Sequence, residues 1–256
     1  MALDGTDSAV VTKLHLKSES QVGSGQKFFV IMACVFTVIT AVGFAPSFYL
    51  RNVPPIGTGY KDLADFPVYL VLHGVALTLW FLLFLVQTVL VQSHRVRVHQ
   101  TLGKVGAILA VMVFTLSLFV VVRSVARSTS HGVPASELGI VVIGNFLIMV
   151  QFACYTASGI RFRRKPDVHR RFMYLASIGL LAPAIARWPS ARIMFPLFIV
   201  LPQFALYLAL ISYDIFSQKR LHRVTKLGLV IYVITLILTV GLGSSDIGRN
   251  FVNMLK

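Results

Sequence analysis

The chain has 256 residues, of which 56% are hydrophobic and only 13% charged, and its formal net charge is +15. A soluble domain carries about 25% charged residues, so this composition excludes an ordinary water-soluble protein. A large positive charge suggests nucleic acid in a soluble protein. Here the basic residues lie in short segments between apolar runs, where they orient membrane helices and contact anionic lipid, so no nucleic-acid partner is expected.

The chain begins with a polar segment, residues 1–26, which predicts a mobile cytoplasmic tail with at most a short amphipathic piece. A transmembrane domain over residues 27–245 follows, because its apolar runs approach or exceed the 20 or so residues that cross a bilayer as a helix. A short extracytoplasmic tail, 246–256, is polar and amphipathic. The predicted spans are Lys27–Leu50, Pro67–Gln92, Leu102–Val122, Leu138–Ile160, Arg171–Ala186, Ile193–Phe216 and Leu227–Leu242.

The lysines and arginines divide unequally between the two ends of these spans. The N-terminal tail and the loops after the second, fourth and sixth spans, together with the first turn of the span that follows each, hold 16 of the 24, against 8 for the other side. Cytoplasmic loops carry such an excess, which places the N-terminus in the cytoplasm and the C-terminus outside. The sequence therefore predicts an all-α, polytopic bundle of seven transmembrane helices in a bacterial inner membrane. Cys34 and Cys154 fall inside apolar runs and are expected to be small buried side chains.

Three basic loops share a pattern. Each has an aliphatic residue and then a histidine shortly before an odd-numbered span, in the sequences RVHQTLG, DVHRRF and RLHRVTKLG. The histidines are His99, His169 and His222. This spacing suggests a helical hairpin used three times after a lone first helix.

Four blocks of the sequence carry a family resemblance: HGVALTLWFLLFLVQTVLV, RVHQTLGKVGAILA, DVHRRFMYLASIGLLAPAIARW and GFAPSFYLR. Across roughly residues 40–230 the chain resembles a widespread bacterial family of uncharacterised seven-helix membrane proteins. The shared pattern is His-Gly, Trp and Gln on the second helix, a His before the third, and Pro-Ala-Ile-Ala-Arg on the fifth. The resemblance implies the architecture and marks residues, but it assigns no chemistry.

His73 is the first candidate for a functional role, because an ionisable group inside a spanning helix is functional by default. The alternative is a neutral imidazole that hydrogen-bonds at a helix interface. Trp80 lies near the same helix face, which makes pure lipid contact improbable for that face.

A second group of polar residues lies in the later spans, close to prolines. Asn and Gln in a membrane usually bond to other helices, whereas a proline can kink its helix and free a carbonyl toward a cavity. With His73 and Trp80, this group forms a predicted binding site near the outer face, with Arg187 as an anion clamp. The group comprises Asn145, Gln151, Arg187, Arg192 and Gln203.

The third candidate is a metal or haem site at the cytoplasmic face, formed by His99, His169 and His222. The competing interpretation is that each histidine sits at a helix N-terminus and caps free backbone N–H groups. Asp214, the one acid near the cytoplasmic end of a span, is expected to pair with a loop arginine.

Three functional hypotheses remain open at this point. The chain binds or carries a small amphiphile such as a quinone, haem or lipid; or it is a redox protein that uses haem or a transition metal; or it is a scaffold for a membrane complex. Nucleotide loops, nucleophile elbows and zinc-protease helices do not occur in the sequence, so no catalytic residue is assigned.

Overall fold

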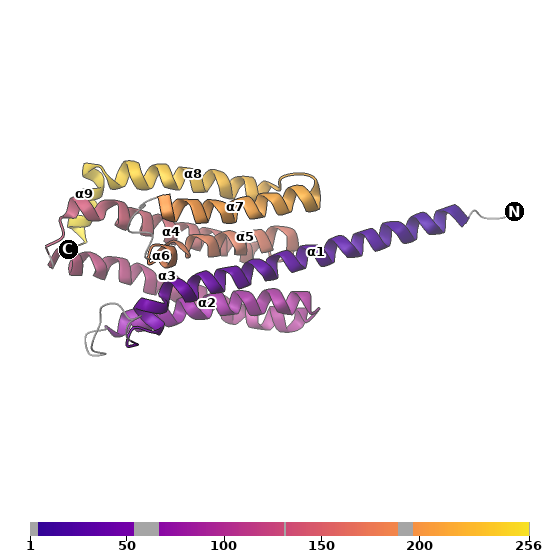
Figure 1. Cartoon of the computed structure of the whole chain (residues 1–256), viewed down its shortest axis with the longest axis horizontal. Coiled ribbons are helices and arrows are strands. Elements are labelled where there is room, and N and C mark those ends of the chain that lie inside the picture. Colours follow the sequence, from indigo (N-terminus) through magenta and orange to yellow (C-terminus); the bar gives the residue numbers. More distant parts are fainter. Residues whose placement is uncertain (1–4, 54–66, 131, 189–196, 256) are drawn as a thin grey trace.

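The computed structural model describes residues 5–53, 67–130, 132–188 and 197–255, and the regular structure within these ranges is helical (Figure 1). The polytopic helical bundle predicted from composition is thereby confirmed. The helices are α1 (Gly5–Phe44), the short π-helix η1 (Ala45–Tyr49), α2 (Val68–Gln92), α3 (Val96–Ser130), α4 (Ala135–Arg161), α5 (Pro166–Gly179), α6 (Ala182–Ile185), α7 (Leu197–Gln218), α8 (Arg223–Gly243) and α9 (Asp246–Met254).

Six segments within the described residues are long and apolar enough to cross a membrane. They are Gly25–Tyr49, α2, α3, α4, Ile199–Gln218 of α7, and α8. Large apolar side chains point outward from them, including Val68, Ile108 and Phe216, which are 72%, 65% and 77% exposed. Such an apolar exterior is stable only against lipid, so the chain has the architecture of a multi-pass membrane protein.

The fifth predicted span, Arg171–Ala186, is not a continuous helix. The chain forms α5, which starts before that span with Pro166 in its first turn, and then the single-turn α6. Leu180 and Leu181 separate the two, and Pro183 follows, which has no N–H to continue the ladder of hydrogen bonds. The prediction of a proline kink is borne out here as a complete break.

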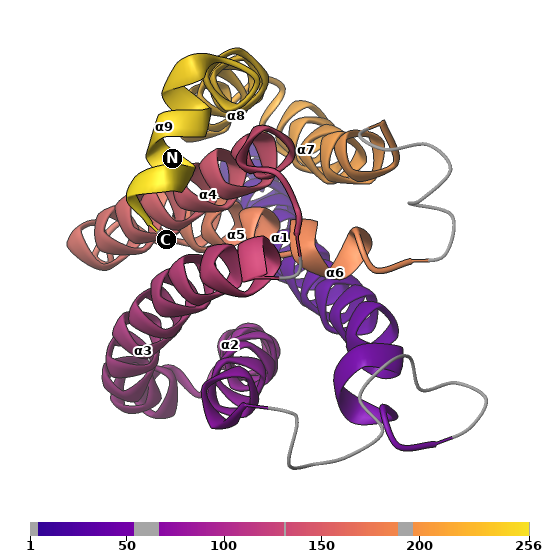
Figure 2. The same ribbon diagram turned by 90° about the vertical axis from the view of Figure 1, so that its left-hand side faces the viewer.

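Helix α5 lies at the centre of the bundle although it is the least apolar of the long helices (Figure 2). Seven of its residues are buried, among them Arg171 and Tyr174, neither of which is accessible at all. It packs against α1, α4, α7 and α8. The other helices therefore shield α5 from lipid, so it does not need an apolar exterior of its own.

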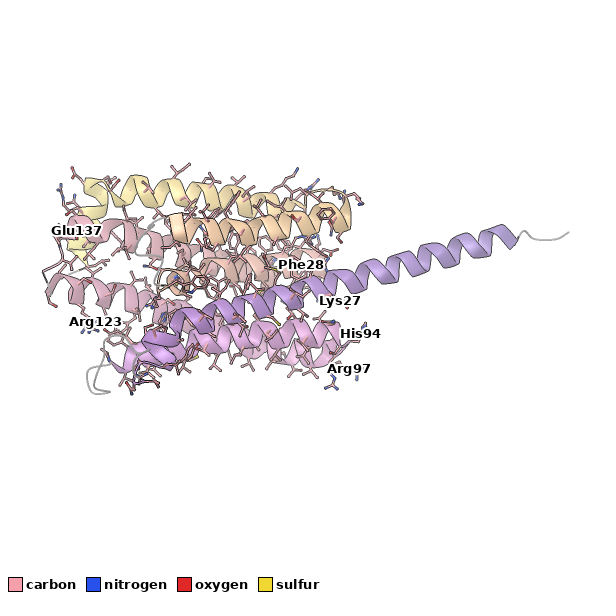
Figure 3. The ribbon with its side chains drawn as sticks, viewed as in Figure 1. Lys27, Phe28, His94, Arg97, Arg123 and Glu137 are labelled. Atoms are coloured by element: carbon pink, nitrogen blue, oxygen red, sulfur yellow. The ribbon has the colours of Figure 1, made fainter. Side chains whose placement is uncertain are left out.

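Helix α1 extends well past the end of the bundle, so the chain is helical from Gly5 where the composition predicted a mobile tail. Lys27 lies where α1 leaves the bundle, at the same end as His94 of the α2–α3 turn and Arg97 of α3 (Figure 3). Arg123 and Glu137 lie at the opposite end. The predicted beginning of the first span at Lys27 thus coincides with the level of the basic turns.

The C-terminal segment folds back as α9 and packs against α4 and α8. The Phe251 ring lies 5.8 Å from that of Phe146, and Val252 is fully buried. The two cysteines, in contrast, were wrongly expected to be buried: Cys34 and Cys154 are exposed, because each lies on the lipid-facing side of its helix.

Candidate functional site

Polar side chains from three separate elements gather in the half of the bundle that contains α6. His73 of α2 forms a hydrogen bond with Ser117 of α3, with 3.4 Å between Nδ1 and Oγ. Its imidazole also lies within electrostatic range of the Arg187 guanidinium, which follows α6. The two residues that the sequence suggested as neighbours, His73 and Arg187, thus lie within range of each other's charge, and their hydrogen bonds in the described structure are to Ser117 and to the Pro183 carbonyl.

The break between α5 and α6 determines where Arg187 lies. Its Nη1 donates a hydrogen bond to the Pro183 carbonyl at 2.6 Å, and its guanidinium lies 4.8 Å from the Phe44 ring centroid at the end of α1. Helices α1 and α6 touch closely, since a Cβ on Gly43 would come within 2.3 Å of the Ala184 carbonyl oxygen. The guanidinium is thus fixed on two sides, while the residue itself remains exposed.

A groove of about 250 Å³ lies between α1 with η1 and α2. Tyr49 of η1 and Thr78 of α2 hydrogen-bond across it, with 2.7 Å between their oxygens. Thr40 is 3% exposed, and its hydroxyl has no hydrogen-bond partner among the described residues. π-Helical turns inside α-helices are frequent at functional sites. The groove is lined by Thr37, Thr40, Ala41, Tyr49, Thr78, Phe81 and Leu82.

The remaining residues of the predicted outer site do not converge on His73. Trp80 is a core residue: its Nε1 donates to Ser177 Oγ at 3.3 Å, and its ring packs edge-on against Phe152 at 4.9 Å. Asn145 donates only to the Val141 carbonyl of its own helix, at 2.9 Å. These two side chains have packing and local partners in place of a ligand.

The two glutamines each join a pair of helices. Gln151 of α4 donates to Thr235 of α8, and Gln203 of α7 donates to the Ile178 carbonyl of α5 at 3.3 Å. The Ile178 carbonyl lies close to the α5–α6 break and also accepts from the Leu181 backbone N–H at 3.1 Å. Arg192, which the sequence also suggested, lies outside the described residues.

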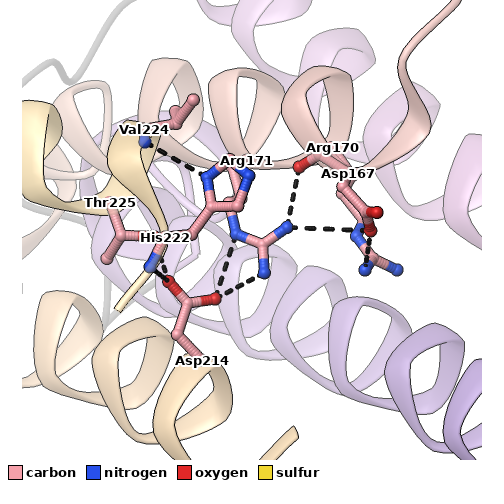
Figure 4. Close-up of polar contacts among 7 residues, drawn as sticks. All are labelled: Asp167, Arg170, Arg171, Asp214, His222, Val224 and Thr225. Atoms are coloured by element: carbon pink, nitrogen blue, oxygen red, sulfur yellow. Dashed lines mark hydrogen bonds and ion pairs between the residues drawn. The ribbon is translucent and has the colours of Figure 1, made fainter. Parts of the chain in front are cut away.

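The most complete polar network lies at the opposite end, where α5, α7 and α8 meet (Figure 4). Arg171 and Asp214 have fully buried side chains, and Arg171 Nε donates to Asp214 Oδ1 at 3.0 Å. The other carboxylate oxygen accepts from the His222 backbone N–H at 3.0 Å and from the Thr225 hydroxyl. The prediction that Asp214 pairs with an arginine is confirmed, but the expected loop position is wrong: Arg171 lies inside α5, and its side chain is fully buried.

The histidine trio divides into a pair and a cap. His99 and His169 face each other, with ring centroids 6.2 Å apart and planes at 82°. His222 instead caps α8, its Nδ1 accepting from the Val224 N–H at 3.1 Å, which is the capping role weighed above for all three. Within the described parts of the chain, no group of three or more His, Cys, Asp or Glu residues is arranged to hold a metal ion.

Burial, with the nearby charge of Arg171 acting in the same direction, lowers the pKa of the His222 imidazole below its usual range. A lowered pKa keeps the ring neutral at pH 7, and only the neutral ring offers Nδ1 as an acceptor. The electrostatics of the network therefore match the capping geometry.

Comparison of the chain with protein-family models, curated proteins and solved structures gives no match.

Proposed function

We propose that this chain is a seven-crossing protein of a bacterial inner membrane, with its N-terminus in the cytoplasm, that binds a small amphiphile such as a quinone, haem or lipid. It would belong to the uncharacterised seven-helix family that it resembles. The broken unit of α5 and α6 provides the seventh crossing, beside the six long apolar segments. Anionic lipid contacts the basic cytoplasmic turns.

The observation that carries this proposal is the half-buried imidazole of His73, which bonds to Ser117 between two apolar helices and lies within range of the Arg187 charge. An imidazole and a guanidinium together suit a head group with a carbonyl, carboxylate or phosphate oxygen. The groove between α1, η1 and α2 has an apolar lining and one hydroxyl, that of Thr40, without a hydrogen-bond partner among the described residues, and it gives an apolar tail a surface to follow. The site is thus smaller than the sequence suggested, without Trp80, Asn145, Gln151 or Gln203.

Ligand-induced thermal stabilisation of the purified chain in detergent tests the proposal. A panel of a short-chain quinone, haem and phosphatidylglycerol is titrated against the wild type. The ligand that stabilises it is expected to bind at least tenfold more weakly to His73→Ala and to Arg187→Ala. Arg249→Gln is the matched control, because Arg249 is exposed on α9 and pairs only with Asp246 among the contacts described.

Two results contradict amphiphile binding at this site. One is equal stabilisation of the wild type and both variants by every ligand in the panel. The other is that no ligand stabilises the wild type, while a fixed membrane partner copurifies with it, which favours the scaffold hypothesis.

A further inference from the structure

The pair formed by His99 and His169 lies at the end of the bundle remote from the proposed amphiphile site. Each is the fourth residue of its helix, α3 and α5, and each helix follows a basic turn. The third histidine of the repeated pattern, His222, precedes its helix as a cap. Only the first two members of the pattern are therefore structurally equivalent, and these two meet.

The His169 ring is oriented as metal-bound histidines usually are, with one ring nitrogen hydrogen-bonded to the backbone. Its Nδ1 lies 2.8 Å from the Gly159 carbonyl oxygen, which can only accept, so Nδ1 carries the proton. The lone pair of the neutral ring is then on Nε2. A histidine that donates one ring N–H to a backbone carbonyl and presents the other nitrogen is the usual arrangement around bound transition metals.

His99 supplies the second, independent observation. Its Nδ1 is buried and has no hydrogen-bond partner among the described residues, and the same is true of Gln87 Oε1. Gln87 lies beside the same stretch of α3: its backbone is close to the His99 ring, and its Nε2 is 3.7 Å from the position of a Cβ on Gly103. Buried polar atoms are usually paired, and here the two packed helices α2 and α3 each carry one that has no partner among the described residues.

We propose that His99 and His169 bind a late first-row transition-metal ion of the class that prefers imidazole, such as Zn²⁺ or copper. Metal–nitrogen bonds of about 2.0–2.1 Å place two imidazoles on one ion with their centroids roughly 5–6 Å apart, close to the separation seen here. The Gln87 amide oxygen and solvent complete the coordination. This site is independent of the proposed amphiphile site at His73 and Arg187.

Metal titration of the full-length chain in detergent tests the site. The protein carries a purification tag without histidine and is first stripped with a chelator. Calorimetric titration with Zn²⁺ is expected to give one ion per chain, bound at least tenfold more weakly by His99→Ala and by His169→Ala. With one equivalent of Cu²⁺, electron paramagnetic resonance is expected to show imidazole nitrogen coupling that both substitutions reduce.

Two control variants test whether metal binding depends on His99 and His169 and not on the other histidines. His94→Asn removes an exposed histidine of the α2–α3 turn, whose φ of 57° asparagine tolerates. His222→Asn removes the third histidine but keeps an acceptor for the α8 cap. Both are expected to bind as the wild type does, and a loss of affinity in His222→Asn overturns the two-histidine site.

One further variant keeps the proposal testable if the alanine variants fold poorly. Gln87→Glu replaces the unpartnered amide oxygen by a carboxylate and is expected to tighten Zn²⁺ binding severalfold. Unchanged affinity in this variant and in both alanine variants, or less than a tenth of an ion bound by the wild type, overturns the proposal.

Discussion

Arg171 and Asp214 are both charged and both inaccessible, an arrangement that is costly unless each charge has several partners. Asp214 accepts from the Arg171 guanidinium, the His222 backbone and the Thr225 hydroxyl, and Arg171 Nη1 also donates to the Asp167 carbonyl at 2.7 Å. Each carboxylate oxygen of Asp214 thus accepts two hydrogen bonds, and the network joins α5, α7 and α8 at one point.

The helix cap formed by His222 makes the stability of the folded chain depend on pH. The pKa of His222 is lowered in the folded chain, so below about pH 6.5 the unfolded chain binds more protons at this residue. Its contribution to stability is complete above that pH and is lost as the pH falls through the lowered pKa. Melting temperatures measured in detergent between pH 7.5 and pH 5 are expected to fall less steeply in His222→Asn than in the wild type.

The alanine substitution separates the cap from the titration. His222→Ala removes the acceptor at every pH, so it is expected to destabilise the chain by about 1 kcal/mol at pH 7.5, whereas His222→Asn keeps most of the cap. Parallel pH profiles for wild type and His222→Asn speak against a titrating His222 cap.

The partners of single residues were the hardest feature to predict from the sequence. His73 and Arg187 were expected near each other because both lie close to the outer ends of their segments. Trp80 and Gln203 are polar and intramembrane as well, but their partners, Ser177 and the Ile178 carbonyl, depend on how each helix is rotated about its axis. Periodicity within one helix does not fix that rotation relative to another helix.

At the scale of elements, the ends of α2, α4 and α8 lie within a few residues of the expected spans, because a long apolar run has one stable structure in a bilayer. Pro183 signalled the break after α5, yet the central position of α5 was not predicted. Its sequence has little apolar character, and shielding by other helices is a property of the assembled bundle that the linear sequence does not display.

Glycine positions test the packing of these elements. A Cβ on Gly43 would meet the backbone of Ala184 in α6, which cannot move away cheaply, so Gly43→Ala is expected to destabilise the chain by about 1–3 kcal/mol. Gly241 of α8 is the matched control: a Cβ there meets nothing within 4 Å, and Gly241→Ala is expected to be neutral or to stabilise by up to about 1 kcal/mol. Unfolding by denaturing detergent, followed by circular dichroism, measures both variants.

Equal stability of the two variants means that α1 and α6 do not pack as described. That result also removes the reason for the position of Arg187, because its contacts with Phe44 and Pro183 depend on the same junction.

At the scale of the whole molecule, the unequal distribution of basic residues and the course of the chain make a prediction about sidedness. In a chain with Cys34 and Cys154 replaced by alanine, a single cysteine is introduced at Ser136, Arg163 or Arg220, each exposed at an end of the bundle. An impermeant maleimide added to intact spheroplasts is expected to label Ser136→Cys only. Arg163→Cys and Arg220→Cys react after permeabilisation.

The reverse labelling pattern would mean that the chain has the opposite orientation in the membrane. Labelling of Arg220→Cys but not Arg163→Cys in intact spheroplasts shows that the α5–α6 unit does not cross the membrane, since α7 alone then separates the two sites from each other.

The polar character of α5 has a consequence for biosynthesis. An arginine at the centre of an isolated membrane helix costs about 2.5–3.5 kcal/mol on insertion scales, so α5 has little tendency to enter lipid alone. Asp214 lies 43 residues after Arg171 and is therefore synthesised later. We therefore expect α5 to take its place in the bundle only once α7 is present, when Arg171 and Asp214 can pair.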